Sequence, residues 1–187
     1  MVTVGIFVGG ASRRMGGAPK GLLPAPDRGE PLVVRAARVA REAGLSPCLV
    51  GRADAYVRTL PDLAVIDDAP AGIGPLGGLR ALLDARGPVV IALACDMPWV
   101  DVDALSALRD ATGTAPVVAA RRAPDAPWEP LLARYDARAV IPAIDAALAA
   151  GERSFQAVLR RLPVAELTLP PQVLQDWDAP EDLPPRA

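Results

Sequence analysis

A glycine-rich stretch with several basic side chains directly follows the first apolar run of the chain. Residues 8–23 read VGGASRRMGGAPKGLL. Glycine lets the backbone approach an anion without a Cβ in the way, so successive N–H groups can bind phosphate oxygens. The candidate anion-binding residues of this stretch are Gly9, Gly10, Arg13, Arg14, Gly16, Gly17 and Lys20. Together they predict a loop that could hold a triphosphate.

Lys20 is the only lysine of the chain, beside nineteen arginines, and it lies in a loop that we expect to be exposed. A guanidinium suits planar, bidentate recognition, whereas an ammonium is a compact charge that can follow a phosphate during transfer. This single use of lysine predicts that Lys20 contacts a reacting phosphate. A solvated surface lysine is the alternative.

Two well-known phosphate loops do not fit the spacing of this stretch. The dinucleotide motif GxGxxG does not occur in it. Lys20 is followed by Gly21 rather than by Ser or Thr, so the GxxxxGK[ST] motif is not satisfied either. The loop alone therefore leaves open a glycine-rich surface turn that binds no ligand.

Three carboxylates could serve a phosphate-binding site. Asp96 directly follows the apolar run VVIALAC, and Asp176 and Asp178 flank Trp177, so an extended strand would present both on one side. Mg²⁺ prefers oxygen ligands and keeps substrate phosphates as partners. The residues alone leave two interpretations open, a Mg²⁺ site and carboxylates that cap the turns after them.

The complete absence of histidine limits the chemistry of any active site. It excludes Ser-His-Asp and Cys-His nucleophiles and His-ligated zinc. The net charge of −2 and the pI near 5.2 provide no basic surface for nucleic acid. Phosphoryl and nucleotidyl transfer remain, because positioning and charge neutralisation do most of the catalysis there.

Length and hydrophobicity indicate one domain in the cytoplasm. The 187 residues suffice for one substantial core. No apolar run reaches the ~18 residues of a membrane span, and the N-terminus lacks a secretory pattern. Cys48 and Cys95 lack a CxxC or metal-like spacing, so we expect two reduced thiols in or near the core.

Short apolar runs alternate with helical patterns along the chain. Strands are predicted at 2–8, 46–51, 63–68, 88–98 and 115–120, and helices at 31–44, 76–87 and from Asp101 or Asp103 through Arg109. This alternation predicts an α/β fold with a mostly parallel sheet and helices on both faces. After residue 121 the pattern predicts helices near 137–150 and 153–161 and a strand at 163–169.

Four ordered motifs resemble the molybdenum cofactor guanylyltransferases and their nucleotidyltransferase relatives. Residues 7–23 closely resemble the family signature LAGGxSxRMGxxKxLL, with Phe7-Val8 in place of Leu-Ala and one additional residue between Gly16 and Lys20. DD followed by GPLGGL (74–79), CDMPWV (95–100) and DWDAPEDL (176–183) follow in family order. The resemblance implies a single Rossmann-like nucleotidyltransferase domain over 1–187. Its nucleotide-binding half would span 1–120, and 121–187 would form an acceptor-side half with a C-terminal metal segment.

The resemblance implies transfer of GMP from GTP to the phosphate of molybdopterin, with release of pyrophosphate and dependence on Mg²⁺. Implied partners are GTP, a molybdopterin-type phosphorylated acceptor and proteins that handle the molybdenum cofactor. Guanine is favoured because Gly9-Gly10 follows the LAGG pattern, where cytidylyl relatives tend to read LAAG. Cytidylyl or other nucleotidyl transfer to molybdopterin or to a sugar or polyol phosphate is the alternative. A catalytically silent nucleotide-binding subunit is another, although it would not require the metal carboxylates.

Individual roles are likewise implied by the resemblance. Catalytic residues are Lys20, Asp96 and Arg14, and metal ligands are Asp96 and Asp178, with Asp176 as the competing ligand. Nucleotide-binding residues are Val8, Gly9, Gly10, Lys20, Gly51, Asp68, Gly77, Gly78 and Asp96. Gly51 departs from relatives that carry Asn there, and Asp replaces Asn at 176 and 178. On the acceptor side, Trp128 could stack on a pterin while Arg121 and Arg122 hold its phosphate, and an ordinary rim aromatic is the alternative.

Overall fold

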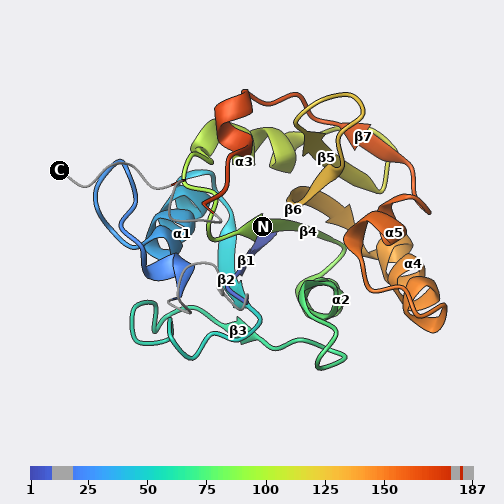
Figure 1. Ribbon diagram of the computed structural model, residues 1–187, viewed down its shortest axis with the longest axis horizontal. Coiled ribbons are helices and arrows are strands. Elements are labelled where there is room, and N and C mark those ends of the chain that lie inside the picture. Colours follow the sequence, from blue (N-terminus) through green and yellow to red (C-terminus); the bar gives the residue numbers. More distant parts are fainter. Residues whose placement is uncertain (10–18, 178–181, 183–187) are drawn as a thin grey trace.

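The computed structural model describes residues 1–9, 19–177 and Asp182. Over these residues, seven strands form one sheet in the order β3-β2-β1-β4-β6-β5-β7 (Figure 1). The strands are β1 (Thr3–Phe7), β2 (Ser46–Val50), β3 (Val65–Ile66), β4 (Val89–Ala94), β5 (Val117–Arg121), β6 (Trp128–Asp136) and β7 (Val164–Glu166). The helices are α1 (Leu32–Glu42), α2 (Pro75–Arg86), α3 (Val102–Asp110), α4 (Ala137–Ala149) and α5 (Phe155–Leu159), with 3₁₀ turns η2 (Lys20–Leu22) and η3 (Pro171–Leu174).

The parallel part of the sheet is built around β1. This strand pairs in parallel with β2 and with β4, and Phe7 lies opposite both Val50 and Ala94. The three strands therefore end at one edge of the sheet. Residues that follow them, among them Gly9, Gly51 and Asp96, emerge side by side although they lie far apart in the sequence. Ligands of parallel sheets bind at such carboxyl ends.

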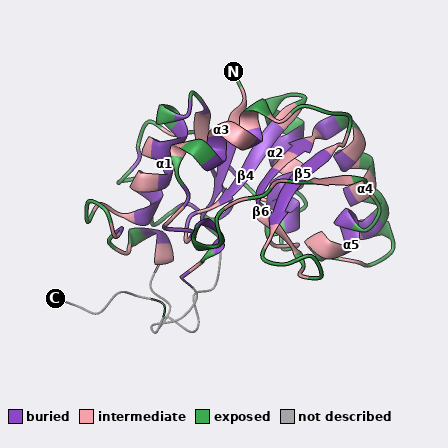
Figure 2. Cartoon of the chain, turned by 90° about the horizontal axis from the view of Figure 1, so that it is seen from above, coloured by how far each residue is buried: buried purple, intermediate pink, exposed green. Residues whose placement is uncertain are grey.

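Helices cover both faces of the sheet, as predicted. Buried residues of α1 and α3 pack in one core cluster, and those of α2, α4 and α5 pack in another. The two groups of helices lie on opposite sides of the strands in Figure 1. Buried residues concentrate along the strands and on the inner sides of the helices (Figure 2). The mostly parallel α/β fold expected from the sequence is confirmed.

Strand β6 was not predicted from the sequence. It runs antiparallel between β4 and β5, and thereby joins the second half of the chain to the sheet. Its segment, WEPLLARYD, contains Pro130 and charged residues, and only three of its nine positions are buried. Proline lacks a donor for the ladder and usually argues against an interior strand. The other predicted elements are present, although β3 is limited to two residues.

Several local expectations are also met. Asp101 is the N-cap of α3, and its carboxylate accepts a hydrogen bond from the Ala104 N–H at 2.9 Å. Cys48 and Cys95 are free, buried thiols, and burial raises the pKa of Cys48 to about 11. Within the described part of the chain, no helix has the length and apolar character needed to cross a membrane.

Candidate active site

A cavity of about 530 Å³ opens at the carboxyl ends of β1 and β2. The Val8 N–H donates to the Val50 carbonyl at 3.1 Å, and the Gly51 N–H donates to the Ile66 carbonyl at 2.9 Å, so the sheet's bonding continues to the cavity floor. The cavity is lined by Phe7, Val8, Gly9, Pro19, Val50, Gly51, Arg52, Asp54, Ala55, Tyr56, Asp68, Gly74 and Pro75. Four predicted nucleotide-binding residues, Val8, Gly9, Gly51 and Asp68, thus share one wall.

Gly9 and Gly51 bring two backbone segments close together in this wall. Gly51 has φ +91°, a conformation that side-chain-bearing residues rarely adopt. A Cβ on Gly51 would lie 3.5 Å from the Cα and N of Gly9. That distance is an ordinary van der Waals contact, so the positive φ, rather than a lack of space, explains why a glycine fits at position 51. At Gly9 and Gly51 the cavity wall therefore presents backbone groups.

Lys20 and Asp96 form an ion pair across 76 positions of sequence, with 3.1 Å between Nζ and Oδ2. Lys20 begins the turn η2, whose Leu23 N–H donates to the Lys20 carbonyl. Asp96 follows β4, and the preceding Cys95 N–H donates to the Phe7 carbonyl at 3.2 Å. Their side chains are only 16% and 21% exposed. The expectation that Lys20 lies in an exposed loop is therefore wrong, because the turn folds its side chain onto the strand edge.

The C-terminal segment reaches Asp96 through Trp177. The Trp177 N–H donates to the Asp96 carbonyl at 2.9 Å. The indole is 3% exposed and packs in a small cluster with Ala25 and Leu32. This segment was expected beside the site only because of its carboxylates, and the apolar anchor between them was missed. Among the predicted site residues, Gly10, Arg14 and Asp178 lie outside the described residues, as do Arg13, Gly16 and Gly17.

Asp68, from the segment after β3, is one of two carboxylates that line the cavity, and Asp54 is the other. Burial raises the pKa of its carboxyl above the ordinary value, the neighbouring Asp67 raises it further, and Arg52 opposes both.

Gly77 and Gly78, predicted to bind nucleotide, are buried positions of α2. A Cβ on Gly78 would lie 2.8 Å from the Val50 Cγ1 and 2.9 Å from the Asp68 Oδ1, so a glycine there lets the helix pack against β2 and beside this carboxylate. The cavity wall at this point consists of Gly74 and Pro75 instead.

Tyr56 is a site residue that the sequence analysis missed. Its ring lines the cavity and the residue is only 3% exposed. Burial raises the pKa of its phenol to about 12, with Cys95 and Asp96 adding to the shift, while a hydrogen bond from the Gly21 backbone opposes it. A Cβ on Gly21 would lie 2.8 Å from the tyrosine Cε1. The ring therefore packs under the turn that carries Lys20, and it stays neutral near pH 7.

The arginines predicted to hold an acceptor phosphate are paired with carboxylates of the protein. Arg121 bonds Glu166 at 2.6 Å, and its guanidinium lies 4.6 Å from the centroid of the Trp128 ring. Arg122 bonds Glu129 at 3.0 Å and Asp176 at 2.9 Å. We call this group the arginine rim; its members are Arg121, Arg122, Trp128, Glu129, Glu166 and Asp176. Asp176, the competing metal ligand, thus helps to hold the C-terminal segment on β5 and β6.

A model of the MobA-like NTP transferase domain matches residues 4–166. The chain belongs to this family. It is 38% identical over 184 residues to a molybdenum cofactor guanylyltransferase of Pseudomonas putida strain F1, with 95% of this chain and 93% of that protein covered. It is 33% identical to a probable molybdenum cofactor guanylyltransferase of Opitutus terrae, with 95% and 90% covered.

Solved structures share the fold of this family. The chain is similar to the molybdopterin-guanine dinucleotide biosynthesis protein A from Archaeoglobus fulgidus, with a TM-score of 0.77, 23% identity, and 97% and 94% of the two chains covered. A 2-C-methyl-D-erythritol 4-phosphate cytidylyltransferase from Thermus thermophilus also superposes, with a TM-score of 0.68, 15% identity, and 97% and 95% covered. The fold is therefore common to proteins named for guanine and for cytosine nucleotides.

The side chains that could ligate a metal ion near Lys20 fit a site in which Mg²⁺ is bound together with a nucleotide. Among the described residues, no group of three or more His, Cys, Asp or Glu side chains could hold a metal ion. Mg²⁺, however, is typically bound by one or two carboxylates together with waters and substrate phosphates. Asp96 offers hard carboxylate oxygens beside Lys20, at an edge where phosphates would lie. The site thus fits a cation that arrives with a nucleotide better than a resident cage of protein ligands.

Proposed function

We propose that this chain transfers GMP from GTP to the phosphate of molybdopterin and releases pyrophosphate. The observation that carries the proposal is the Lys20–Asp96 pair, 3.1 Å apart, beside a cavity walled by glycine backbone. The curated relatives support it, because they are named molybdenum cofactor guanylyltransferases and align over most of both chains. With these substrates, we expect the protein to work in the cytoplasm, beside proteins that handle the molybdenum cofactor.

In the proposed reaction, an oxygen of the acceptor phosphate attacks the α-phosphorus of GTP. A bond forms between that oxygen and phosphorus, and the bond from phosphorus to the bridging oxygen of pyrophosphate breaks. A phosphate monoester is already largely ionised near pH 7, so no general base is required. This agrees with a chain that contains no histidine.

Lys20 would donate hydrogen bonds to phosphate oxygens, where its charge offsets the negative charge that develops during transfer. Asp96 would hold Mg²⁺, and Asp178 remains our proposed second ligand. When bound, this cation would supply charge neutralisation for the phosphates and the leaving pyrophosphate. Because Lys20 pairs with Asp96, nucleotide binding would exchange part of this contact for contacts to phosphate. Arg14 and Gly10 are proposed to complete the phosphate-binding loop.

Guanine recognition would rely on backbone groups of the cavity. A guanine edge presents an O6 acceptor and N1 and N2 donors. The segments at Gly9 and Gly51 carry backbone groups with no side chain in the way. The Gly51 N–H itself already donates to the Ile66 carbonyl, so other backbone groups of these two segments would contact the base. Binding the wrong base would leave such groups unpaired, at ~1–3 kcal/mol each. We therefore propose a preference for GTP over CTP and ATP.

A panel of GTP, CTP, ATP and UTP, assayed for pyrophosphate release with and without molybdopterin, tests this function. We expect release with GTP and molybdopterin together, and only in the presence of Mg²⁺. Faster turnover of CTP would replace the guanylyl assignment by cytidylyl transfer. Release with a sugar or polyol phosphate, but not with molybdopterin, would replace the acceptor. Tight nucleotide binding without release in any combination would indicate a silent subunit.

A further inference from the structure

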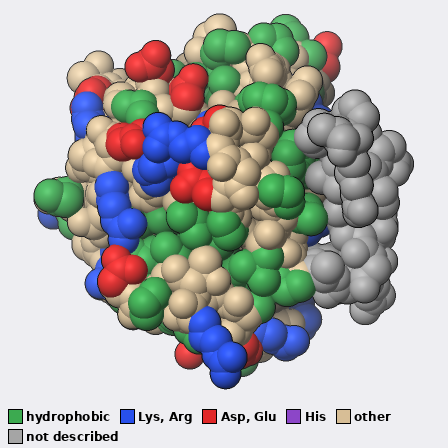
Figure 3. Space-filling model, turned by 90° about the vertical axis from the view of Figure 1, so that its left-hand side faces the viewer, with side chains coloured by type: hydrophobic (Ala, Val, Ile, Leu, Met, Phe, Trp, Pro, Cys, Tyr) green, Lys and Arg blue, Asp and Glu red, His purple; other side chains and the backbone are tan. Residues whose placement is uncertain are grey.

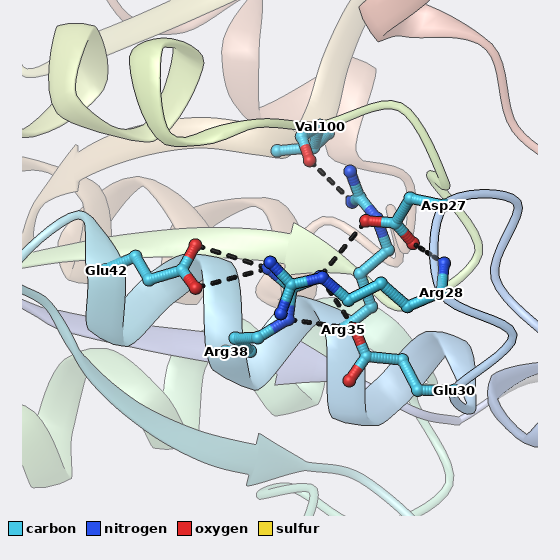
Figure 4. A network of polar contacts seen from close by, with 7 residues as sticks. All are labelled: Asp27, Arg28, Glu30, Arg35, Arg38, Glu42 and Val100. Carbon is cyan, nitrogen blue, oxygen red and sulfur yellow. Dashed lines mark hydrogen bonds and ion pairs between the residues drawn. The ribbon is translucent and has the colours of Figure 1, made fainter.

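Arg35, in the first turn of α1, connects the segment that follows Lys20 to the segment that follows Asp96. Its Nε donates to the Asp27 Oδ2 at 3.1 Å, and its Nη1 donates to the Val100 carbonyl at 2.6 Å (Figure 4). The side chain is only 11% exposed. Its stem borders a small void together with Met97 and Pro98, directly under the turn after Asp96. One guanidinium therefore contacts both the loop that follows Lys20, at Asp27, and the segment that follows Asp96, at Val100.

On the Lys20 side, an unbroken series of hydrogen bonds leads from the pair to α1. The Leu23 N–H donates to the Lys20 carbonyl at 3.0 Å, and the Leu32 N–H donates to the Leu23 carbonyl at 2.9 Å. Leu32 is the first residue of α1, and Arg35 follows three residues later. The turn that carries Lys20 is thus connected to the start of this helix by backbone hydrogen bonds. A shift of α1 would move Lys20 with it.

On the Asp96 side, the connection is short as well. Val100 lies four residues after Asp96, and its N–H closes a turn onto the Met97 carbonyl at 3.4 Å. Asp101, the next residue, caps α3. The carbonyl that Arg35 holds is therefore fixed both to the turn after Asp96 and to the start of a helix. Because the contact is charge-assisted and mostly buried, it is stronger than an exposed ion pair.

We propose that Arg35 is a positioning residue that sets Lys20 in register with Asp96 for nucleotide binding and transfer. This inference rests on the proposed function for its catalytic consequence. The partners of Arg35 lie beside the pair rather than in it, so the residue acts by holding α1 against the turn after Asp96. A displacement of about 1 Å at a catalytic group can cost about 100-fold in rate. A single guanidinium that bridges both supports is suited to prevent it.

Arg38 provides a matched comparison on the same helix. It bonds Asp27 at 3.0 Å, Glu30 at 2.6 Å and Glu42 at 3.2 Å (Figure 4). All three partners lie on α1 or on the loop before it, and none lies on the turn after Asp96. On the face that carries α1, arginines and acidic side chains lie next to one another (Figure 3). Arg38 thus makes more ion pairs than Arg35 while connecting nothing to Asp96.

The test compares Arg35→Met and Arg38→Met, because methionine keeps much of the apolar stem and removes the charge in both. Two readouts are measured below the melting temperature of each variant. One is kcat and KM for GTP from pyrophosphate release. The other is the rate at which acetic anhydride acetylates Lys20 in nucleotide-free protein, followed by mass spectrometry. Because Lys20 is the only lysine, one peptide reports this rate.

For Arg35→Met we expect kcat to fall about tenfold, with a smaller change in KM for GTP, and Lys20 acetylation to rise several-fold. Arg38→Met should keep the wild-type values of both. Arg35→Lys, which keeps the charge but can serve only one of the two partners, should recover part of kcat. Equal changes in Arg35→Met and Arg38→Met, or wild-type values in Arg35→Met, would overturn the positioning role. If the wild type released no pyrophosphate, the proposed function would fail, while the acetylation rates would still decide the role of Arg35.

Discussion

Two regions at the same edge of the sheet differ in the surroundings of their charged side chains. The nucleotide edge, by which we mean Val8, Gly9, Lys20, Gly51, Asp68 and Asp96, combines glycine backbone, a cavity and the Lys20–Asp96 ion pair. The arginine rim, at the ends of β5 and β6, fills its space with ion pairs between Arg121 or Arg122 and three carboxylates. Both contain cations that a phosphate could attract. The first lies beside a cavity of about 530 Å³, whereas the guanidinium groups of the second already pair with carboxylates.

The difference teaches that a position at the carboxyl edge does not by itself make a binding residue. In the arginine rim, the protein's own carboxylates already occupy the guanidinium groups, and they tie the C-terminal segment to the sheet. At the nucleotide edge, Asp68 stands beside another acid and its pKa is raised by burial, an arrangement that opposes stability. A carboxyl group whose pKa is raised by burial beside a cavity indicates a ligand-binding site. Arginines and carboxylates that pair with one another indicate a structural role.

The largest expected effect is that of Asp96→Asn, which removes a charge from the nucleotide edge. We expect turnover to fall at least about 100-fold at every Mg²⁺ concentration, because the amide cannot neutralise a cation. Pyrophosphate release over a Mg²⁺ series measures this. Asp84→Asn, an exposed carboxylate on α2, is the control and should behave like the wild type. Near-normal turnover of Asp96→Asn would remove the proposed metal role.

Lys20→Ala should have the next largest effect, a loss of about 100-fold to 1,000-fold in kcat with little change in melting temperature. The ion pair is partly exposed, so it contributes about 1 kcal/mol to the free energy of unfolding. Lys20→Arg should recover only part of the activity, because a planar fork replaces a point charge. If Lys20→Ala turned over GTP at the wild-type rate, the phosphate role of Lys20 would be wrong.

A smaller effect is expected at the arginine rim. Arg122→Met should lower activity by less than about tenfold, because its partners Glu129 and Asp176 already use the guanidinium for structure. The free energy of unfolding should fall by less than ~1 kcal/mol, since half of the side chain is exposed. Denaturant unfolding and the KM for molybdopterin measure the two effects. A much larger rise in that KM would show that the arginine rim does hold the acceptor, and would erase the contrast between the regions.

The smallest effect is a gain in stability. Because burial raises the pKa of Asp68, the folded protein binds the proton more tightly than the unfolded chain, and the charged carboxylate opposes folding above the folded pKa. Asp68→Asn should therefore raise the melting temperature slightly at pH 7, and the gain should fade as the pH drops toward the ordinary value of 3.8. GTP affinity should fall in the same variant. A lower melting temperature at pH 7 would indicate that Asp68 serves structure.

The sequence predicted the parallel strands because buried strands leave a clear signal, namely short β-branched runs bounded by glycine or proline. It predicted the helices on both faces for a similar reason, and it left Asp101 and Asp103 as alternative starts of α3, of which the structure shows Asp101 as the N-cap. Strand β6 left no such signal, because its pairing depends on β4 and β5 on either side rather than on its own pattern. Tyr56 was missed because nothing in its neighbourhood marks an aromatic residue as part of a cavity.

By itself, the sequence determined the composition of the candidate site: a glycine-rich loop, a single lysine and an aspartate after a buried strand, in a chain without histidine. Only the tertiary structure decided which of these groups meet. Lys20 and Asp96 are 76 positions apart, and they meet because parallel pairing ends β1 and β4 at one edge. Trp177 joins them through a backbone hydrogen bond that any residue except proline could donate. A local sequence pattern predicts a strand, a helix or a loop together with the side chains it carries. Contacts between residues far apart in the sequence depend on how the strands pair and the helices pack.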